Sequence, residues 1–351
     1  MQEWKNEYNS FNSAKGFLYK QWYDGVISGN FLPPIEVNID PVNNCNLYCK
    51  WCNARKVINR KKEEIMPTEH LLKVIQFLAD WGVKAVCFAG GGESVLHPDL
   101  DKAFIKCKQV GIKSALITNG LFLDDNQLET IARHAHWIGV SVDAAKPQTF
   151  KDLKGLNAFD KVIRNIQQIS VIGTRELTYK FLIHPDNQFE IYDACIKAKQ
   201  LGCHRFHARP LSFLNYQDKE DKYYIEEIER QVALCHKLNT KNFEVITAFH
   251  KYDKDMHRSI NFKKCLASPI LAVFEANGDV NICLDRKGDP KTVLCSHYPD
   301  PSVVKQVWGS KRHKKLLDSI DPKKDCPKCT FNKYNEQAEA YSEGKMSWEF
   351  T

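Results

Sequence analysis

The chain has 351 residues, 43% of them hydrophobic, and a formal net charge of +7. This length allows one large domain with a smaller one beside it, and the composition is that of a globular protein and not of a disordered chain. The sequence contains no apolar run long enough to span a bilayer, and residues 1–21 lack the apolar core of a signal peptide. We therefore expect a cytoplasmic location and no membrane partner.

The positive charge favours a basic surface and an anionic partner, but lysines also solvate helices without binding anything. The densest basic run, residues 311–315, opens an apparent amphipathic helix. Binding of nucleic acid is therefore not indicated by the charge.

Cysteine is abundant for a cytosolic protein, with thirteen residues. The odd number and the length of the chain argue against a secreted disulfide framework. Seven of the thirteen fall into two metal-like patterns, and five others lie in apolar patterns typical of small core residues. Cys295 fits neither group.

Residues 35–211 alternate short apolar strands with amphipathic helices, after an aromatic N-terminal extension over residues 1–34. Glycines end several of the helices, as helix C-termini prefer. Six β/α repeats predict an α/β fold with a parallel sheet, either open or curled into a barrel. The expected strands are Ile35–Ile39, Ala85–Ala89, Lys113–Thr118, Trp137–Val142, Thr178–Ile183 and Arg205–Ala208. The expected helices are Thr68–Trp81 with Thr68 as N-cap, Pro98–Val110, Asp124–His134, Phe159–Ile172 and Gln188–Leu201.

Three cysteines follow the first expected strand with the spacing C-x3-C-x2-C: Cys45, Cys49 and Cys52. A loop this short can direct three thiolates at one iron–sulfur cluster, and thiolate is also a ligand for zinc. Three ligands leave one iron of a cubane open to a substrate or cofactor. A zinc knuckle remains the alternative, although such sites more often pair two C-x2-C units or add histidines.

With Trp51 directly before Cys52, this loop resembles the one in radical S-adenosylmethionine (radical SAM) enzymes. The resemblance implies a partial (β/α)6 TIM-type barrel and a [4Fe-4S] cluster on the three cysteines. It further implies that SAM binds the open iron and is cleaved reductively to a 5′-deoxyadenosyl radical. An electron donor such as flavodoxin or ferredoxin would then be a partner.

Polar residues follow the next three expected strands, where the chemistry of such barrels is located. The second strand ends in a glycine run and Glu93, which resembles the family's GGE motif for the SAM amino group. Polar residues at the third and fourth strand ends would contact SAM by the same resemblance, while turn and capping chemistry is the alternative. The cofactor-binding set is Trp51, Gly91, Gly92, Glu93, Thr118, Asn119, Ser141 and Asp143.

Four charged residues are the candidates for substrate binding and catalysis. Lys180 and Arg209, on the fifth and sixth expected strands, can hold a carboxylate of SAM or substrate. Asp285 and Arg286 follow Cys283 closely and would lie near a second cluster. Solvated loop charges are the alternative for this second pair.

The C-terminal region has its own cysteine pattern. Residues 212–255 are expected to form a helical bridge, and residues 256–351 an auxiliary domain with a hairpin that turns at Asn277-Gly278. Four cysteines there can close a tetrahedral site for zinc or iron–sulfur: Cys265, Cys283, Cys326 and Cys329. Their spacing resembles the twitch and SPASM domains of radical SAM enzymes, which implies a second [4Fe-4S] cluster. Cys295 is the competing ligand.

These features predict a radical SAM oxidoreductase that abstracts hydrogen from a polar small molecule, with net dehydrogenation of a sugar or cyclitol. Redox-neutral rearrangement, epimerisation and peptide modification are alternative reactions. A zinc-stabilised nucleic-acid-binding protein is the alternative of another class.

Overall fold

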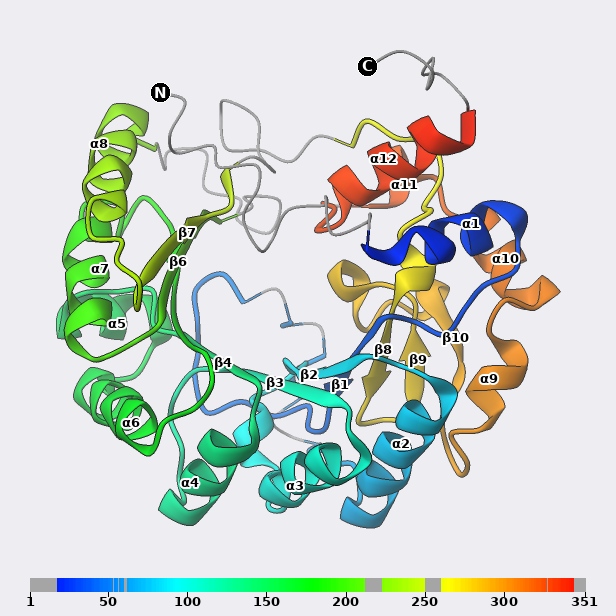
Figure 1. The fold of residues 1–351 in the computed structure, drawn as a ribbon, viewed down its shortest axis with the longest axis horizontal. Coiled ribbons are helices and arrows are strands. Elements are labelled where there is room, and N and C mark those ends of the chain that lie inside the picture. The colour runs from blue at the N-terminus through cyan, green and yellow to red at the C-terminus, as the bar shows by residue number, and fades with distance from the viewer. Residues whose placement is uncertain are drawn as a thin grey trace.

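The computed structural model describes residues 18–52, 54–55, 57–59, 62–211, 223–249, 260–326 and 328–343. Within these ranges ten strands form one sheet in the order β10-β9-β8-β1-β2-β3-β4-β5-β6-β7, which curves around a concave inner face (Figure 1). The strands are β1 (Glu36–Asp40), β2 (Ala85–Phe88), β3 (Lys113–Thr118), β4 (Trp137–Ser141), β5 (Leu177–Ile183), β6 (Arg205–Pro210), β7 (Glu244–Thr247), β8 (Leu271–Glu275), β9 (Asp279–Asn281) and β10 (Val293–Ser296).

Strands β1 to β7 pair in parallel, and helices connect them along the outer face of the sheet. The sheet does not close, because β7 and β10 are its two edges. The predicted α/β fold is therefore confirmed, as a partial and open barrel. The helices are α1 (Lys20–Ser28), α2 (Thr68–Trp81), α3 (Leu100–Val110), α4 (Asp125–His134), α5 (Pro147–Lys154), α6 (Phe159–Ile172), α7 (Ile191–Gln200), α8 (Ile225–His236), α9 (Val303–Val307), α10 (Lys311–Asp318), α11 (Pro322–Asp325) and α12 (Asn332–Glu343).

Helix α2 forms as its apolar period predicts, since Leu71, Val74 and Leu78 are buried at helical spacing. It ends at Gly82, which adopts a φ of 101° that only glycine adopts readily. The predicted N-cap is wrong. Pro67 occupies the capping position, and the hydroxyl of Thr68 instead donates to Asp99 at 2.6 Å.

Helix α5 was not expected from the sequence. Its eight residues are mostly polar, and only Phe150, Leu153 and Lys154 are buried. A helix this short, with so few apolar residues, gives no clear amphipathic period. Its place between β4 and α6 matters for the site described below.

The two faces of the sheet differ in chemistry. Side chains such as Ile39, Phe88 and Tyr179 are fully buried against the outer helices and form the main core. Successive side chains of a strand point to opposite faces, so Asp40 and Lys180 belong to the inner face, as the strand registers show. The fold thus places a polar surface inside an apolar shell.

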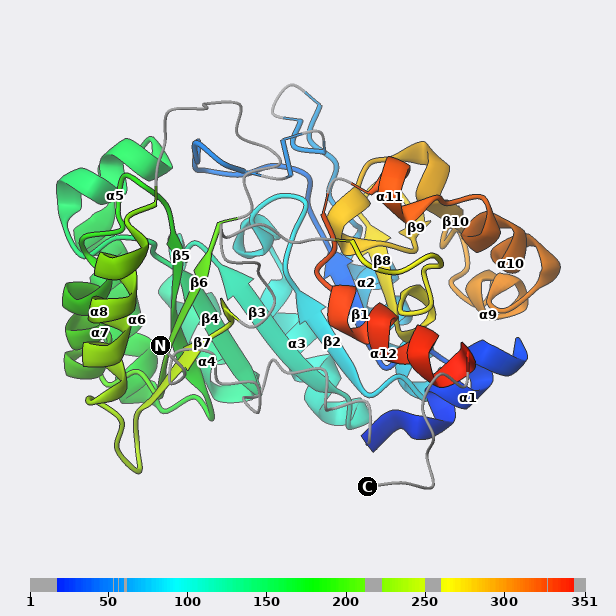
Figure 2. The same ribbon diagram turned by 90° about the horizontal axis from the view of Figure 1, so that it is seen from above.

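The C-terminal hairpin joins the same sheet. Strand β8 pairs in parallel with β1, with Glu275 opposite Asp40, and β9 and β10 continue the sheet in antiparallel pairing. The hairpin was predicted, but its pairing with β1 was not. The sheet consequently runs through both predicted domain boundaries, near residues 211 and 256 (Figure 2).

None of the helices in the described ranges is long and apolar enough to cross a membrane.

Candidate functional site

The loop that carries Cys45, Cys49 and Cys52 lies between β1 and α2, and all three cysteines are partly exposed and form no disulfide. Its backbone rests on the end of α5, because the N–H groups of Tyr48 and Lys50 donate to the carbonyls of Lys154 and Leu153 at 2.9 and 3.0 Å. These carbonyls belong to the last turn of α5, where a helix leaves acceptors unused. The unexpected helix therefore supports the cysteine loop.

The three thiols of this loop suit a cluster as donors. Burial raises the pKa of the Cys45 thiol to about 12, and Glu93, Cys49 and Cys52 add to the rise. Such thiols stay protonated at neutral pH until a metal displaces the proton. Across the described residues no group of three or more His, Cys, Asp or Glu side chains stands as close as a single metal ion requires. The three thiols fit a cluster because they lie in one loop, where neighbouring thiols raise one another's pKa.

The glycine run after β2 packs against the cysteine loop. A Cβ on Gly92 would lie 2.0 Å from the carbonyl oxygen of Asn44, so no other residue fits there. The N–H groups of Gly92 and Glu93 donate to Val42 and Asn44 at 3.1 and 2.8 Å. Gly91 lies where a Cβ would touch the carboxylate of Asp40, so the run occupies the junction between the loop and the inner face.

Glu93 is 5% exposed, and its carboxylate accepts three hydrogen bonds from within the protein. It accepts hydrogen bonds from the Thr118 hydroxyl at 2.8 Å and from the Asn119 N–H at 2.7 Å. The Val95 N–H donates to it at 3.3 Å. Burial raises the pKa of Glu93, against these hydrogen bonds. Glu93 therefore links the ends of β2 and β3, and its predicted contact with SAM stays a prediction.

The end of β3 is tied to the cysteine loop as well, because the Asn119 side-chain amide donates to Asn46 at 2.7 Å. Ser141 ends β4 on the inner face, opposite Lys180 of β5. Asp143, by contrast, has a φ of 60°, so the alternation predicted to place it on the same side as Ser141 does not extend beyond the strand.

Asp143 forms a buried ion pair with Lys154, which the sequence analysis did not single out. Their side chains are 1% and 3% exposed. The other carboxylate oxygen of Asp143 accepts the Leu182 N–H at 2.7 Å. The Lys154 ammonium also lies 5.9 Å from the centre of the Trp51 ring. Burial opposes the charge of Lys154, but Asp143 and the thiols of Cys49 and Cys45 outweigh it and raise its pKa.

Lys180 and Arg209 lie on the inner face, on β5 and β6. The Lys180 side chain extends across Gly139, since a Cβ on Gly139 would lie 2.8 Å from the Lys180 Cδ. The Lys180 ammonium is 5.6 Å from the centre of the Trp137 ring. Burial, together with the charge of Arg209, lowers the pKa of Lys180 to about 8. Within the described part of the chain, Lys180 makes no ion pair with a carboxylate.

A cavity of about 270 Å³ lies between the cysteine loop and the C-terminal hairpin, with Gly91 in its lining. Asp40 and Glu275 line it from the ends of β1 and β8, and Lys287 bonds to Asp40 at 2.8 Å. Burial, with the nearby Asp40, raises the pKa of Glu275 to about 7. These residues could not be expected from the sequence, because only the pairing of β8 with β1 brings them together.

The four C-terminal cysteines come from three segments and lie close enough to raise one another's pKa. Burial raises the pKa of the Cys265 and Cys283 thiols to about 12, and in both cases Cys326 adds to the rise. Cys329 raises the pKa of Cys283 and accepts a hydrogen bond from Asn335 at 3.6 Å. Cys295 lies apart from them, buried in β10 within the main core.

Asp285 and Arg286 are committed to this C-terminal region. Asp285 accepts the N–H of Thr330 at 2.6 Å and its hydroxyl at 3.0 Å, which ties the hairpin to the loop after Cys326. Arg286 pairs with Asp289 at 2.7 Å. The structure does not point either side chain into bulk solvent, and their predicted catalytic role stays a prediction.

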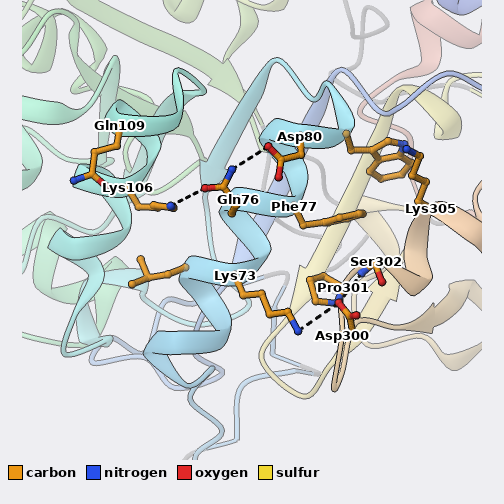
Figure 3. Close-up of a pocket in the computed structure, with 12 residues that line it drawn as sticks. Lys73, Gln76, Phe77, Asp80, Lys106, Gln109, Asp300, Pro301, Ser302 and Lys305 are labelled. Atoms are coloured by element: carbon orange, nitrogen blue, oxygen red, sulfur yellow. Dashed lines mark hydrogen bonds and ion pairs between the residues drawn. The ribbon is translucent and has the colours of Figure 1, made fainter.

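One further groove, of about 770 Å³, lies on the outer side of the barrel between α2, α3 and residues 300–305 (Figure 3). Its rim carries the ion pair of Lys73 with Asp300 at 3.5 Å. None of the predicted site residues lines it, so it is separate from the candidate site.

Known proteins resemble this chain in sequence and in fold. Residues 39–195 match the family model of the radical SAM superfamily. A "Probable GTP 3′,8-cyclase" from Saccharolobus islandicus is 24% identical over 274 residues, which cover 75% of this chain and 86% of the relative. The crystal structure of Streptococcus suis SuiB bound to its precursor peptide SuiA is 18% identical with a TM-score of 0.67, covering 87% of this chain and 71% of that one.

A second solved structure, native anSMEcpe with bound AdoMet, is 16% identical with a TM-score of 0.61 and covers 89% of this chain and 98% of that chain. At these identities the two structures establish a shared fold. The sequence match extends from the end of β1 into α7 and includes the cysteine loop and the glycine run. The likeness to the radical SAM superfamily is therefore established for residues 39–195.

Proposed function

We propose that this chain is a radical SAM enzyme that abstracts a hydrogen atom from a polar small molecule bearing an anionic group. Cys45, Cys49 and Cys52 would hold the [4Fe-4S] cluster, and the ends of β2, β3 and β4 would hold SAM. When bound, these groups supply a 5′-deoxyadenosyl radical. The observation that carries the proposal is the three-thiol loop packed against the glycine run of a radical SAM domain.

The inner face of the barrel supports an anionic substrate. Lys180 has no carboxylate partner within the described residues, and Arg209 two strand positions on adds a second cation. Lys180 is partly buried, and removing an ammonium group from water is costly unless an anion pairs with it, which favours a ligand that supplies one. A phosphate or carboxylate would do so, and guanidinium binds either in a bidentate manner. The relatives named as GTP cyclases make a nucleotide one candidate of this class.

Two outcomes of the hydrogen abstraction have support. The four C-terminal cysteines, with Cys295 buried elsewhere, favour a second cluster closed by protein ligands. Such a cluster would accept the electron left on the substrate, and the net reaction would be the dehydrogenation of a sugar or cyclitol. The names of the relatives favour instead a redox-neutral rearrangement, in which no electron leaves the substrate. Peptide modification is supported here by the fold shared with SuiB and by no feature of the site.

The proposal is tested by anaerobic reconstitution with iron and sulfide, reduction with dithionite and measurement of 5′-deoxyadenosine formed from SAM. We expect the wild-type chain to form it and the triple variant Cys45→Ala/Cys49→Ala/Cys52→Ala to form none, because its loop offers no thiolate. Cys107→Ala, in the buried face of α3, is the matched control and should retain cleavage. Undiminished cleavage by the triple variant would refute the assignment.

A further inference from the structure

Lys154 stands out among the buried charges of the barrel because it faces the cysteine loop from a helix with no other charged buried residue. Its ammonium makes one ion pair, with Asp143, and lies close enough to Cys49 and Cys45 to interact electrostatically with both thiols. The Trp51 ring lies beside it. Its main-chain carbonyl accepts the Tyr48 N–H at 2.9 Å, so the same residue touches the loop with both backbone and side chain.

The fit between α5 and the loop is tight. Gly155, which ends α5 with a φ of 74°, has no room for a Cβ, since that atom would lie 2.9 Å from the Cβ of Tyr48. The carbonyls of Leu153 and Lys154 both accept N–H groups of the loop. A displacement of the end of α5 would therefore disturb the backbone contacts that support the cysteine loop.

Asp143 holds Lys154 in this position. One carboxylate oxygen bonds to the ammonium and the other to the Leu182 N–H at 2.7 Å, which fixes the carboxylate on β5. The Asn187 amide donates to the Asp143 carbonyl at 2.8 Å and holds its backbone as well. The Lys154 ammonium thus interacts with the thiols, and its carboxylate partner is held in place by Leu182 and Asn187.

We propose that Lys154 and Asp143 form a charge pair that positions the cysteine loop and sets the reduction potential of the cluster it holds. This inference rests on the proposed function, because it needs the [4Fe-4S] cluster on Cys45, Cys49 and Cys52. Reduction adds one electron to the cluster, so a nearby positive charge favours the reduced state and a nearby negative charge opposes it. The two residues should therefore act on the potential in opposite directions.

The test is an EPR-monitored redox titration of the reconstituted chain. Lys154→Met keeps the length and helix propensity of the side chain but removes the ammonium, and reduction should become at least tenfold less favourable, a fall of about 59 mV for one electron. Asp143→Asn removes the negative charge, and asparagine tolerates the positive φ of this position. Its potential should rise. Lys151→Met, an exposed residue in the last turn of the same helix, should leave the potential unchanged.

Opposite shifts in the two variants, with the double variant near the wild type, would support the pair. A purely structural role would move both potentials in one direction through disorder of the loop, and that result would overturn the inference. If Lys154→Met binds no iron, the test depends on Asp143→Asn alone. A reduction potential equal to that of the wild type in Asp143→Asn would then overturn the inference. A wild-type chain that forms no 5′-deoxyadenosine would overturn the proposed function and this inference together, whereas unchanged potentials in an active chain overturn only the inference.

Discussion

The two cysteine regions of this chain are built in different ways. The N-terminal one places Cys45, Cys49 and Cys52 in a single loop that the ends of β2, β3 and α5 hold from several sides. The C-terminal one gathers Cys265, Cys283, Cys326 and Cys329 from three segments joined by side-chain contacts such as that of Asp285 with Thr330. The first depends on local sequence within the barrel, and the second depends on tertiary packing of a smaller region.

This difference has a functional reading. Three thiolates leave an iron open to a cofactor, while four close a cluster so that it can only transfer electrons. Asn43, at the start of the N-terminal loop, lines the same cavity as Gly91, Asp40 and Glu275. Charged side chains near the C-terminal cysteines pair with each other within the protein, as Arg286 does with Asp289 at 2.7 Å. A reactive centre and an electron-transfer centre would need these two environments.

The largest expected effect separates the ligands of the C-terminal region. Cys329→Ser should lower the iron content from roughly eight to roughly four per chain, because it removes one of four thiolates from the second cluster. Cys295→Ser should keep roughly eight, since Cys295 is buried in β10 within the main core. Iron and sulfide analysis of both reconstituted variants makes the comparison. Loss of iron in Cys295→Ser with retention in Cys329→Ser would show that the ligand set is wrong.

The sequence could predict local features of the chain, but not those that depend on tertiary packing. The cysteine loop, the glycine run and the strands β1 to β6 are local patterns, and each was expected within a few residues of its observed place. Pairing of β8 with β1 could not be expected, because the choice of a strand's neighbour depends on contacts far apart in the chain. The inner-face group of Asp40, Glu275 and Lys287 was missed for that reason.

Lys154 illustrates the second limit. In the sequence it is one lysine in a short polar segment, and lysine in such a segment is usually solvated. Its burial follows from the packing of α5 against the cysteine loop, and its partner Asp143 was expected to contact SAM instead. Glu93 is similar, since its motif was visible but its three hydrogen-bond partners were not.

A smaller effect is expected at Glu93, which follows the glycine run and is predicted to bind SAM. Glu93→Gln should weaken SAM binding about tenfold or more, because charge-assisted hydrogen bonds contribute about 1.5–3 kcal/mol. It also turns an amide N–H group toward backbone donors at the ends of β2 and β3. Calorimetry of SAM binding provides the measurement. Thr118→Val, which removes one bond to Glu93 but keeps its charge, should weaken binding less.

Equal SAM affinity in Glu93→Gln and the wild type would return Glu93 to a structural role only.

The smallest effect concerns pH and the inner face. The folded-state pKa of Lys180, about 8, lies below its ordinary value of 10.5, so its ammonium is charged below pH 8 and neutral above it. Binding of a polyanion, with GTP as the probe, should therefore weaken severalfold as the pH rises through about 8. Lys180→Met should weaken binding at pH 7 and abolish the step, whereas Lys108→Met, an exposed residue in the last turn of α3, should change neither. If Lys180→Met still lost GTP affinity near pH 8 as strongly as the wild type does, Lys180 would be excluded as the titrating group.

The division of labour between the two cysteine regions is tested most directly by EPR of the reduced chain with and without SAM. The double variant Cys326→Ser/Cys329→Ser should retain only the N-terminal cluster, and SAM should change its spectrum because an open iron is available. The triple variant Cys45→Ala/Cys49→Ala/Cys52→Ala should retain only the C-terminal cluster, and its spectrum should not respond to SAM. A spectrum that responds to SAM in the triple variant, and not in the double variant, would contradict the assignment of the open iron to the N-terminal loop.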